Sequence, residues 1–482
     1  MPGPTFSTVA RYEAYRAARD LAMWVALVLV AVAFAVAAWT GRAETTRQYA
    51  EAEAVAAREA LAFAERRAAA VEAERALAAG EDVPSAGPRG PLSAWGLGRG
   101  AGVRIALPPA PLVGLAVGQS DLVPAEVHVT TASPAAAAPE ARPANPLSLL
   151  IGGFDAAFVV LVFLPLALLV ATYDLLSGDR ERGTLRLLLA GPLTASQLAR
   201  ARALVRGGSV LAAALVGLTG VWLFASGGES PARFGLFALA AALYGVFWIA
   251  LAVFVDARSR SAAANAAALA GAWLGLVVVV PALVHTAASA LVPAPERAAL
   301  VAAQRTAAAE ARRETQATMD RFFAAHPELA RAPREGDPPF HLASLARDEA
   351  IAQAVDLLAA EARTAAEARA RTLGALRFTS PTLLAHDALL DAAGTGHARR
   401  TYLGTQTDAF QERWAAFFRS RIVQGDNAWT VADFDDVPRA ALSEEPAVRA
   451  ARRVVLPLSA LAVLALSLGL LAAARLRAFS PF

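Results

Sequence analysis

Six apolar segments of about twenty residues most strongly limit what this chain can fold into. A hydrocarbon core about 30 Å thick requires that length of helix, and a bilayer accepts only helices and closed barrels. One such segment could be a buried core helix, but six in one chain predict membrane spans. The spans are predicted at residues 21–39, 149–171, 209–225, 234–255, 266–284 and 454–474.

The composition supports the same fold class. Hydrophobic residues make up 56% of the chain, the mean hydropathy is +0.43, and the charged residues, 18% in all, are concentrated between the apolar segments. A soluble domain is nearer 45–50% apolar. We therefore expect an all-α polytopic membrane protein with six transmembrane helices and two large, mainly helical extracytoplasmic insertions, at residues 40–148 and 293–453.

Arginine placement predicts the orientation. Arginines gather in the leader 1–20, the loop 172–208, the connection after the fourth span and the tail 475–482, which share one side when six spans alternate. The positive-inside rule makes that side cytoplasmic, and long external segments do not count. We expect a multi-pass protein of a bacterial plasma (inner) membrane with both termini cytoplasmic. A cleaved signal peptide is the alternative for the first span, but its apolar run exceeds the usual 7–15 residues.

Two absent residue types exclude several kinds of chemistry. The chain has no cysteine, and all 45 of its basic residues are arginine. Thiolate metal sites, cysteine nucleophiles, Schiff-base lysines and the lysine of a phosphate-binding P-loop are all excluded. We expect no enzyme activity, no cofactor and no metal in this chain, so any ATP must be bound by a partner. Arginines at membrane boundaries account for the pI of 9.6, and we expect no nucleic-acid partner.

The first insertion divides into a helix and a segment rich in proline and glycine. Residues 42–79 favour a helix that projects from the membrane, and residues 80–146 contain strand-like pieces at 103–107 and 126–131. The run Gly96–Gly100 superficially resembles a phosphate-binding loop. It follows no strand and opens no helix, so we interpret it as a flexible loop.

The second insertion has helical patterns throughout. Helices are predicted at 296–325 and 344–373, and then as a pair at 381–393 and 397–423 around a turn at 394–396. An aromatic set on the last helix has the spacing of a stripe that packs against a neighbour, with a lipid- or substrate-facing role as the alternative. His386 and His397 lack the spacing of a metal site and are interpreted as surface residues. The aromatic set is Phe410, Trp414, Phe417 and Phe418.

The loop between spans two and three carries the most specific pattern. A charged exit from span two is followed by a turn, a short amphipathic helix that ends near Gly191-Pro192, and a second helix at 195–204. An apolar surface of Leu185, Leu187, Leu188 and Leu189, with a polar rim of Arg180, Glu181, Arg182 and Arg186, is expected on the first helix. Such a helix docks in the groove of a partner protein or lies on lipid headgroups, and composition leaves the two nearly even.

This loop resembles the cytoplasmic loop of ABC-2-type permeases. The resemblance rests on the charged run Asp179–Arg182, Gly183-Thr184-Leu185, a leucine-rich stretch and Pro192. It implies a coupling helix that docks on a separate ATPase through Asp179, Arg180, Glu181, Arg182, Gly183, Thr184, Leu185, Arg186, Leu188 and Pro192. The leader resembles the amphipathic connecting helix of these permeases. The layout is similar to an uncharacterised subfamily with large extracytoplasmic insertions after spans one and five.

The resulting functional prediction is a permease subunit of an ABC-2-type transporter. A separate P-loop ATPase hydrolyses ATP and drives export of a substrate, and a second permease chain, identical or a sister, completes the path across the bilayer. The alternative is a membrane-anchored scaffold or mechanotransmitter that is coupled to an ATPase without moving a substrate. An ion-coupled transporter is a third class, but the spans offer little in the way of ionisable residues beyond Asp155, which is close to the outer edge of span two. Asn265 sits at a span boundary.

Overall fold

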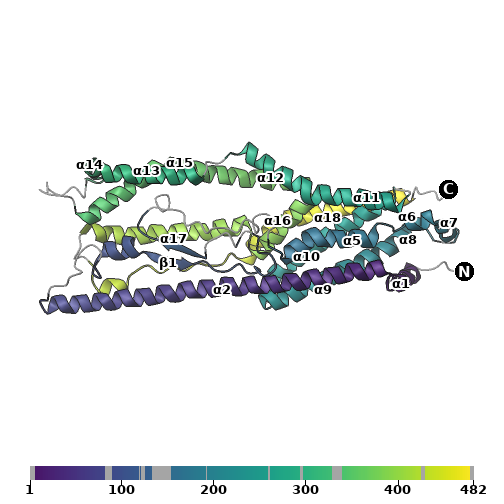
Figure 1. The fold of residues 1–482 in the computed structure, drawn as a ribbon, viewed down its shortest axis with the longest axis horizontal. Helices are drawn as coiled ribbons and strands as arrows, with labels where there is room; N and C mark the ends of the chain where they lie inside the picture. The colour runs from purple at the N-terminus through teal and green to yellow at the C-terminus, as the bar shows by residue number, and fades with distance from the viewer. Residues whose placement is uncertain are drawn as a thin grey trace.

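The computed structural model describes residues 6–81, 90–118, 120, 125–132, 153–191, 193–258, 261–293, 297–327, 339–424 and 429–477. Figure 1 shows an elongated molecule whose helices run along its long axis. Both ends of the chain lie at one end of the molecule, beside α1 (Phe6–Ala17) and α7 (Thr184–Leu189), and we call this the terminal end. The opposite half of the molecule is called the lobe.

Six helical segments in the described part of the chain are long and apolar enough to cross a membrane, which confirms the predicted fold class. In chain order they are Leu21–Ala78 (α2), Ala156–Glu181, Ala195–Ser226, Pro231–Asp256 (α10), Ala262–Leu291 and Ala447–Arg477 (α18). Their shorter elements are α4 (Ala156–Phe158), η3 (Val159–Phe163), α5 (Leu164–Thr172), α6 (Ser177–Glu181), α8 (Ala195–Arg202), η4 (Ala203–Gly207), α9 (Gly208–Ser226), α11 (Ala262–Trp273), η5 (Leu274–Val279) and α12 (Val280–Leu291). The predicted span 149–171 begins outside the described residues.

The spans pack into a bundle with α10 near its centre. Phe237, Tyr244 and Trp248 of α10 are fully buried, and the surrounding core is made of leucine, valine and alanine. Leucines and valines on the outer faces of the helices remain exposed, as a lipid-facing surface requires. Apolar residues thus cover both the inside and the outside of this end of the molecule.

Helix α2 joins the bundle to the lobe without a break. It has 58 residues, begins at the cap Asp20 and includes the predicted projecting helix 42–79 up to Ala78. Figure 1 shows α2 along one edge of the molecule for most of its length. Alanine, arginine and glutamate dominate its outer part and favour an unbroken helix. Where α2 leaves the bundle, Gly41 is in direct contact with the backbone of Gly114.

Helix α16 (Pro381–Ala393) was predicted as a helix, and its bounds agree, but its position was not foreseen. Nine of its residues are buried, and Leu384, Ala388 and Ala392 belong to the core of the bundle. It packs mainly against α10 and α18, and its first residues lie deep among the spans. The sequence placed this segment in an extracytoplasmic insertion because thirteen residues are too short to span a bilayer.

The lobe contains an arm and a core. The arm consists of α13 (Arg297–Arg313), α14 (Thr315–Ala325) and α15 (Phe340–Leu376), which returns toward the bundle (Figure 1). Helix α17 (His397–Gln424) and the distal part of α2 border the core. The bounds of α15 and α17 agree with the predicted helices to within a few residues, but the helix predicted at 296–325 is divided at Glu314 into α13 and α14. The remaining short elements are the 3₁₀ turns η7 (Arg377–Thr379) and η8 (Ala432–Phe434).

The aromatic stripe of α17 forms the centre of the lobe core. Phe410, Trp414 and Phe418 are buried, and Phe418 stacks on Trp429 with ring centroids 5.3 Å apart. The packing interpretation is therefore confirmed, and the lipid- or substrate-facing alternative is wrong for these three rings. Phe417 is partly buried against the same core.

The interpretation of Gly96–Gly100 as a flexible loop is wrong. These residues lie within a π-helical turn, η1 (Gly96–Ala101), that is packed in the lobe core. The carbonyl of Gly98 accepts a hydrogen bond from the indole of Trp414 at 3.0 Å, and a side chain at position 98 would overlap the ring of Phe418. After this turn, β1 (Val103–Ala106) pairs in antiparallel register with β2 (Glu126–Val129), as the strand-like patterns predicted.

Candidate functional site

The loop between spans two and three forms a compact set of short helices at the terminal end. Helix α6 continues from span two, Gly183 in the left-handed conformation (φ 73°) turns the chain, and α7 follows. Helix α8 then begins at a capping box of Thr194 and Gln197 and leads into span three. The two predicted short helices correspond to α7 and α8, whereas the charged run before the turn forms a third helix, α6, that was not predicted.

A buried ion cluster fixes this set of helices to the first helix of the chain. Arg202 of α8 contacts Glu13 of α1 at 2.9 Å and Asp179 of α6 at 2.5 Å, and all three side chains are buried. Arg202 also donates to the carbonyl of Leu175 at 2.6 Å. One guanidinium therefore ties α1, α6 and α8 together with charge-assisted hydrogen bonds.

A second buried cluster fixes α6 to spans four and five. Asp256, at the end of α10, accepts from the backbone N–H groups of Leu176 and Ser177 at 2.7 and 3.2 Å and from the Ser177 hydroxyl at 2.8 Å. The amide of Asn265 on α11 donates to the same carboxylate at 2.7 Å. Because four donors converge on it, the Asp256 carboxyl group fixes the start of α6 to spans four and five.

Glu181 provides a third connection, at the end of α6. Its carboxylate accepts from the backbone N–H of Ala262 at 2.8 Å, at the first turn of span five. A carboxylate at a helix N-terminus is favoured by the helix dipole. Arg206 of η4 also contacts Asp174 at 2.9 Å, where span two ends. Spans two to five thus share contacts with one short segment.

The surface of α7 divides into a buried side and an exposed side. Leu185 is 3% exposed and packs with Leu176 and Leu198, so it does not contribute to the exposed apolar surface expected for it. Leu187 is 76% exposed and Leu188 is 37% exposed. We call Arg182, Arg186, Leu187 and Leu188, which are all exposed, the α7 patch.

The predicted site residues therefore separate into two groups. Asp179, Thr184 and Leu185 face the interior, where the Thr184 hydroxyl donates to the Asp179 carboxylate at 3.0 Å. Arg180 is half-buried, Glu181 is tied to span five, and Gly183 forms the turn. Pro192 lies outside the described residues. Of the predicted residues, Arg182, Arg186 and Leu188 lie on the open surface, and Glu181 and Gly183 are also exposed.

Sequence reasoning missed the residues that hold the site in place. Glu13, Arg202 and Asp256 are almost completely buried, yet each stands beside an apolar helix, where a charge is usually interpreted as marking a boundary. Asn265 was noted only as a residue at a span boundary. A charge directly at the end of a span is the one signal that could have indicated Asp256.

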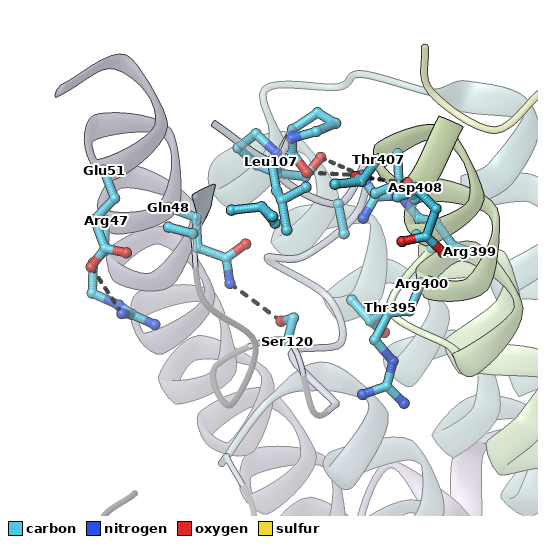
Figure 2. Close-up of a pocket in the computed structure, with 18 residues that line it drawn as sticks. Arg47, Gln48, Glu51, Leu107, Ser120, Thr395, Arg399, Arg400, Thr407 and Asp408 are labelled. Carbon is cyan, nitrogen blue, oxygen red and sulfur yellow. Dashed lines mark hydrogen bonds and ion pairs between the residues drawn. The ribbon is translucent and has the colours of Figure 1, made fainter. Parts of the chain in front are cut away.

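A cavity of about 320 Å³ lies at a second place, where the lobe meets the bundle. Figure 2 shows it between α2, which carries Gln48, and the start of α17, which carries Arg400. Gln48 donates to Ser120 at 3.2 Å across one side. Thr395, in the turn between α16 and α17, is 3% exposed, and its hydroxyl has no hydrogen-bond partner among the residues that the structure describes. Acidic and basic groups are mixed around this cavity, so its lining does not define a ligand by charge.

The family comparison agrees with the architecture and with the loop. The ABC-2 family transporter protein family matches residues 7–360, which includes α1, the first five spans and the loop with the α7 patch. The chain belongs to the ABC-2 transporter family. A domain of unknown function, DUF3526, matches residues 297–440, which form the arm, α16 and α17. None of the curated proteins compared with the chain matches it. This ABC-2 family protein is therefore a membrane component of a transporter.

Proposed function

We propose that this protein is the permease subunit of an ABC-2-type transporter, and that a separate P-loop ATPase docks on the α7 patch. The observation that carries the proposal is an exposed apolar and basic surface directly above a rigid, buried set of ion pairs. Leu187 and Arg186 are free for a partner, while Arg202, Asp256 and Glu181 tie the same segment to the spans. A push on the patch is transmitted to spans two to five because these contacts are short and, apart from the exposed bond between Glu181 and Ala262, buried.

The chain itself supplies no means of binding ATP through a P-loop, since it contains no lysine. ATP hydrolysis therefore belongs to the partner, which we propose to be a P-loop ATPase. A second permease chain, a copy or a sister, would pair with this one to enclose the path. We propose export as the direction and a bacterial plasma membrane as the location, with the termini and the α7 patch cytoplasmic. The arginine distribution and the shared position of both termini support that orientation.

The test replaces Arg186 with Glu and Leu187 with Asp in one variant. Both side chains are exposed, so folding is retained while the charge and the apolar contact of the patch are removed. We expect co-purification of the co-expressed ATPase encoded beside this gene, and permease-stimulated ATP hydrolysis, to fall at least tenfold. A docking contact worth about 1.4 kcal/mol corresponds to that factor.

Leu357→Asp is the matched control for this test. Leu357 lies on α15 in the lobe and is 73% exposed, close to the value for Leu187. The control should retain ATPase binding and hydrolysis. If the patch variant behaves like the control, the ATPase does not dock on α7 and the proposal is wrong.

A scaffold or mechanotransmitter is the second candidate function, and the continuous helix α2 favours it. A rigid helix of 58 residues carries movement from the bundle to the lobe, and the interior of the single bundle is filled by α16 and apolar side chains. Reconstituted permease and ATPase decide between the two. ATP-dependent movement of a substrate across vesicles supports transport, and ATP-dependent rearrangement of the lobe without any flux supports the mechanotransmitter.

A further inference from the structure

Helix α16 is connected to the lobe at both ends but is buried in the bundle. Its N-terminus follows α15 and η7, and its C-terminus turns at Gly394 into α17. The lobe-facing half of the bundle core closes around it: Leu384, Ala385, Ala388, Leu389, Ala392 and Ala393 are fully buried there. Removing α16 would therefore leave a space along the centre of that half.

The deep end of α16 is connected to carbonyl groups in two π-helical turns, to one directly and to the other through Tyr244. The Ser380 hydroxyl, at the cap of α16, donates to Leu276 O of η5 at 2.9 Å. Tyr244 of α10 donates to Leu161 O of η3 at 3.1 Å, and its oxygen lies 3.0 Å from the hydroxyl of Thr382. Because the single proton of Tyr244 goes to Leu161, Thr382 donates to Tyr244.

These anchors are side-chain hydrogen bonds at places where the helical ladder of the receiving spans is already altered. A π-helical turn is rare and is frequent at functional sites, and its carbonyl groups are open to partners outside the helix. In η3 the next carbonyl, Val162 O, likewise accepts from the indole of Trp273 at 3.2 Å. The bonds that hold α16 can therefore break without unfolding the helices that accept them.

The turn after the outer end of α16 borders unfilled space on one side and packs against Pro111 on another. Gly394 and Thr395, directly after the helix, line the cavity of about 320 Å³ between α2 and α17 (Figure 2). A helix in a close-packed core can move along its axis only if volume is free at one end. The buried face of α16 carries small side chains at Ala385, Ala388 and Ala392 beside the larger Leu384 and Leu389. A shift of one turn, about 5.4 Å, is a known step between packed elements and would bring equivalent positions of the helix into register again.

We propose that α16 is a movable plug that closes the lobe-facing half of the bundle and opens it by shifting outward toward the cavity at the α16–α17 turn. The opening would be part of the transport cycle, and to that extent the inference rests on the proposed function. Tyr244, Ser380 and Thr382 are positioning residues that hold the deep end of α16 in the closed state. Arg233, which donates to the carbonyls of Asp391 and Ala392, holds its outer end and must release them when the helix moves. Ser380 and Thr382 leave their partners when α16 moves outward.

The test uses the absence of cysteine in the chain. Ala388→Cys places one thiol on the buried face of α16, where the native side chain is 0% exposed. A charged, membrane-impermeant thiol reagent is added to vesicles of both orientations, and the labelling rate is measured with native Tyr244 and with Tyr244→Phe. The rate follows the population of the open state when opening and closing are fast. Loss of a hydrogen bond of ordinary strength predicts a rate about fivefold higher.

Two controls separate plug movement from general loosening. Ala214→Cys lies in the same bundle core on α9 and should stay unreactive in both backgrounds. Thr382→Val should raise labelling at position 388, and Thr382→Ser, which restores the hydroxyl, should return it to the original rate. If the labelling rate rises at both positions 214 and 388, or at neither, the proposed movement of α16 is wrong.

The same cysteine distinguishes failure of the plug from failure of the proposed function. With the ATPase present, labelling at 388 should change between the nucleotide-free and the ATP-bound complex. Intact stimulation of ATP hydrolysis with unchanged labelling contradicts a role for the plug in the cycle and leaves the proposed function standing. Absent stimulation, together with the Tyr244→Phe effect, contradicts the proposed function and supports the plug.

Discussion

At the scale of single residues, the fold is most restrictive at positions where the backbone packs directly against a neighbouring segment and leaves no room for a side chain. Gly41 lies where α2 leaves the bundle, against the backbone of Gly114, and Gly98 lies under the ring of Phe418. The neighbour of Gly41 is backbone, which cannot move aside as a flexible side chain can, and the neighbour of Gly98 is a ring that is itself buried in the lobe core. These two glycines therefore determine how closely the bundle and the lobe core can pack.

Gly41→Ala should destabilise the protein by about 1–3 kcal/mol, because the added methyl group overlaps the Gly114 carbonyl. The measurement is the unfolding temperature in detergent. Gly404→Ala is the control: position 404 is in α17 with open space around it, and alanine there is expected to be neutral or to stabilise by about 0.5–1 kcal/mol. If the two substitutions change the unfolding temperature equally, the contact between Gly41 and Gly114 does not contribute to stability.

The exposure of individual residues in the loop could be predicted only in part. The sequence identified the correct segment, and Leu187 and Leu188 are exposed as expected. Leu185 has the same chemistry but faces the interior, because the turn at Gly183 sets the rotation of α7. That rotation depends on the contacts of Arg202 and Asp256, which are distant in sequence and leave no local pattern.

At the scale of elements, α2 and α16 show what periodicity and propensity can and cannot predict. The sequence indicated a span and a projecting helix at 21–39 and 42–79, and α2 joins both into one helix. The predicted bounds of α16, 381–393, agree with the structure. Its burial in the bundle could not be predicted, because leucine and alanine fit a soluble core and a membrane core equally well.

If α2 is rigid outside the bundle, two spin labels on it should give one narrow distance. Ala50→Cys and Ala78→Cys are separated by twenty-eight residues, so a continuous helix places their backbones about 42 Å apart. The chain has no native cysteine, so both labels are unique. The measurement is pulsed dipolar spectroscopy in detergent and in lipid. A broad distribution, or a maximum well below that length, would contradict a rigid helix.

At the scale of the whole molecule, a network of arginines and carboxylates joins the lobe to the bundle. Arg233, at the start of α10, donates to the carbonyls of Asp391 and Ala392 and lies 3.8 Å from Glu445. Arg453 of α18 contacts Glu445 at 2.6 Å. The connection between the two halves of the protein is therefore electrostatic at its centre, in contrast to the apolar cores on either side.

This network predicts how stability depends on pH. Burial raises the pKa of Glu445, but the hydrogen bond and charge of Arg453 and the charges of Arg233 and Arg399 outweigh it and lower the pKa below 4.5. The folded protein binds this proton less readily than the unfolded chain. The stabilisation by Glu445 is complete above the unfolded pKa and is lost as the pH falls through the folded pKa.

Glu445→Gln should therefore lower stability by about 2 kcal/mol at neutral pH, the range for a hydrogen bond to a charged group, and by progressively less below pH 4.5. The measurement is the difference in unfolding temperature between the two proteins across that pH range. Glu53→Gln, at an exposed position of α2, should show almost no difference at any pH. A constant difference for Glu445→Gln down to pH 3 would contradict this account.

The two-part architecture was only partly predictable at this scale. Hydropathy predicted six spans, and the helical pattern predicted an arm and a helix pair beyond them. The network around Glu445 joins residues 233, 391, 399, 444, 445 and 453, whose separation along the chain hides their proximity. Such long-range pairing is set by topology, which a single sequence does not display.

The length of α2 makes it a lever arm. Beyond Trp39 the helix continues for about 58 Å to Ala78, so a tilt of only about 5° in the membrane would displace its tip by about 5 Å. A small angular change among the spans would thus be amplified into a movement as large as a helical turn at the far end. The geometry therefore converts a small rotation near the membrane into a large displacement of the lobe, and the force available at the tip of α2 is correspondingly smaller.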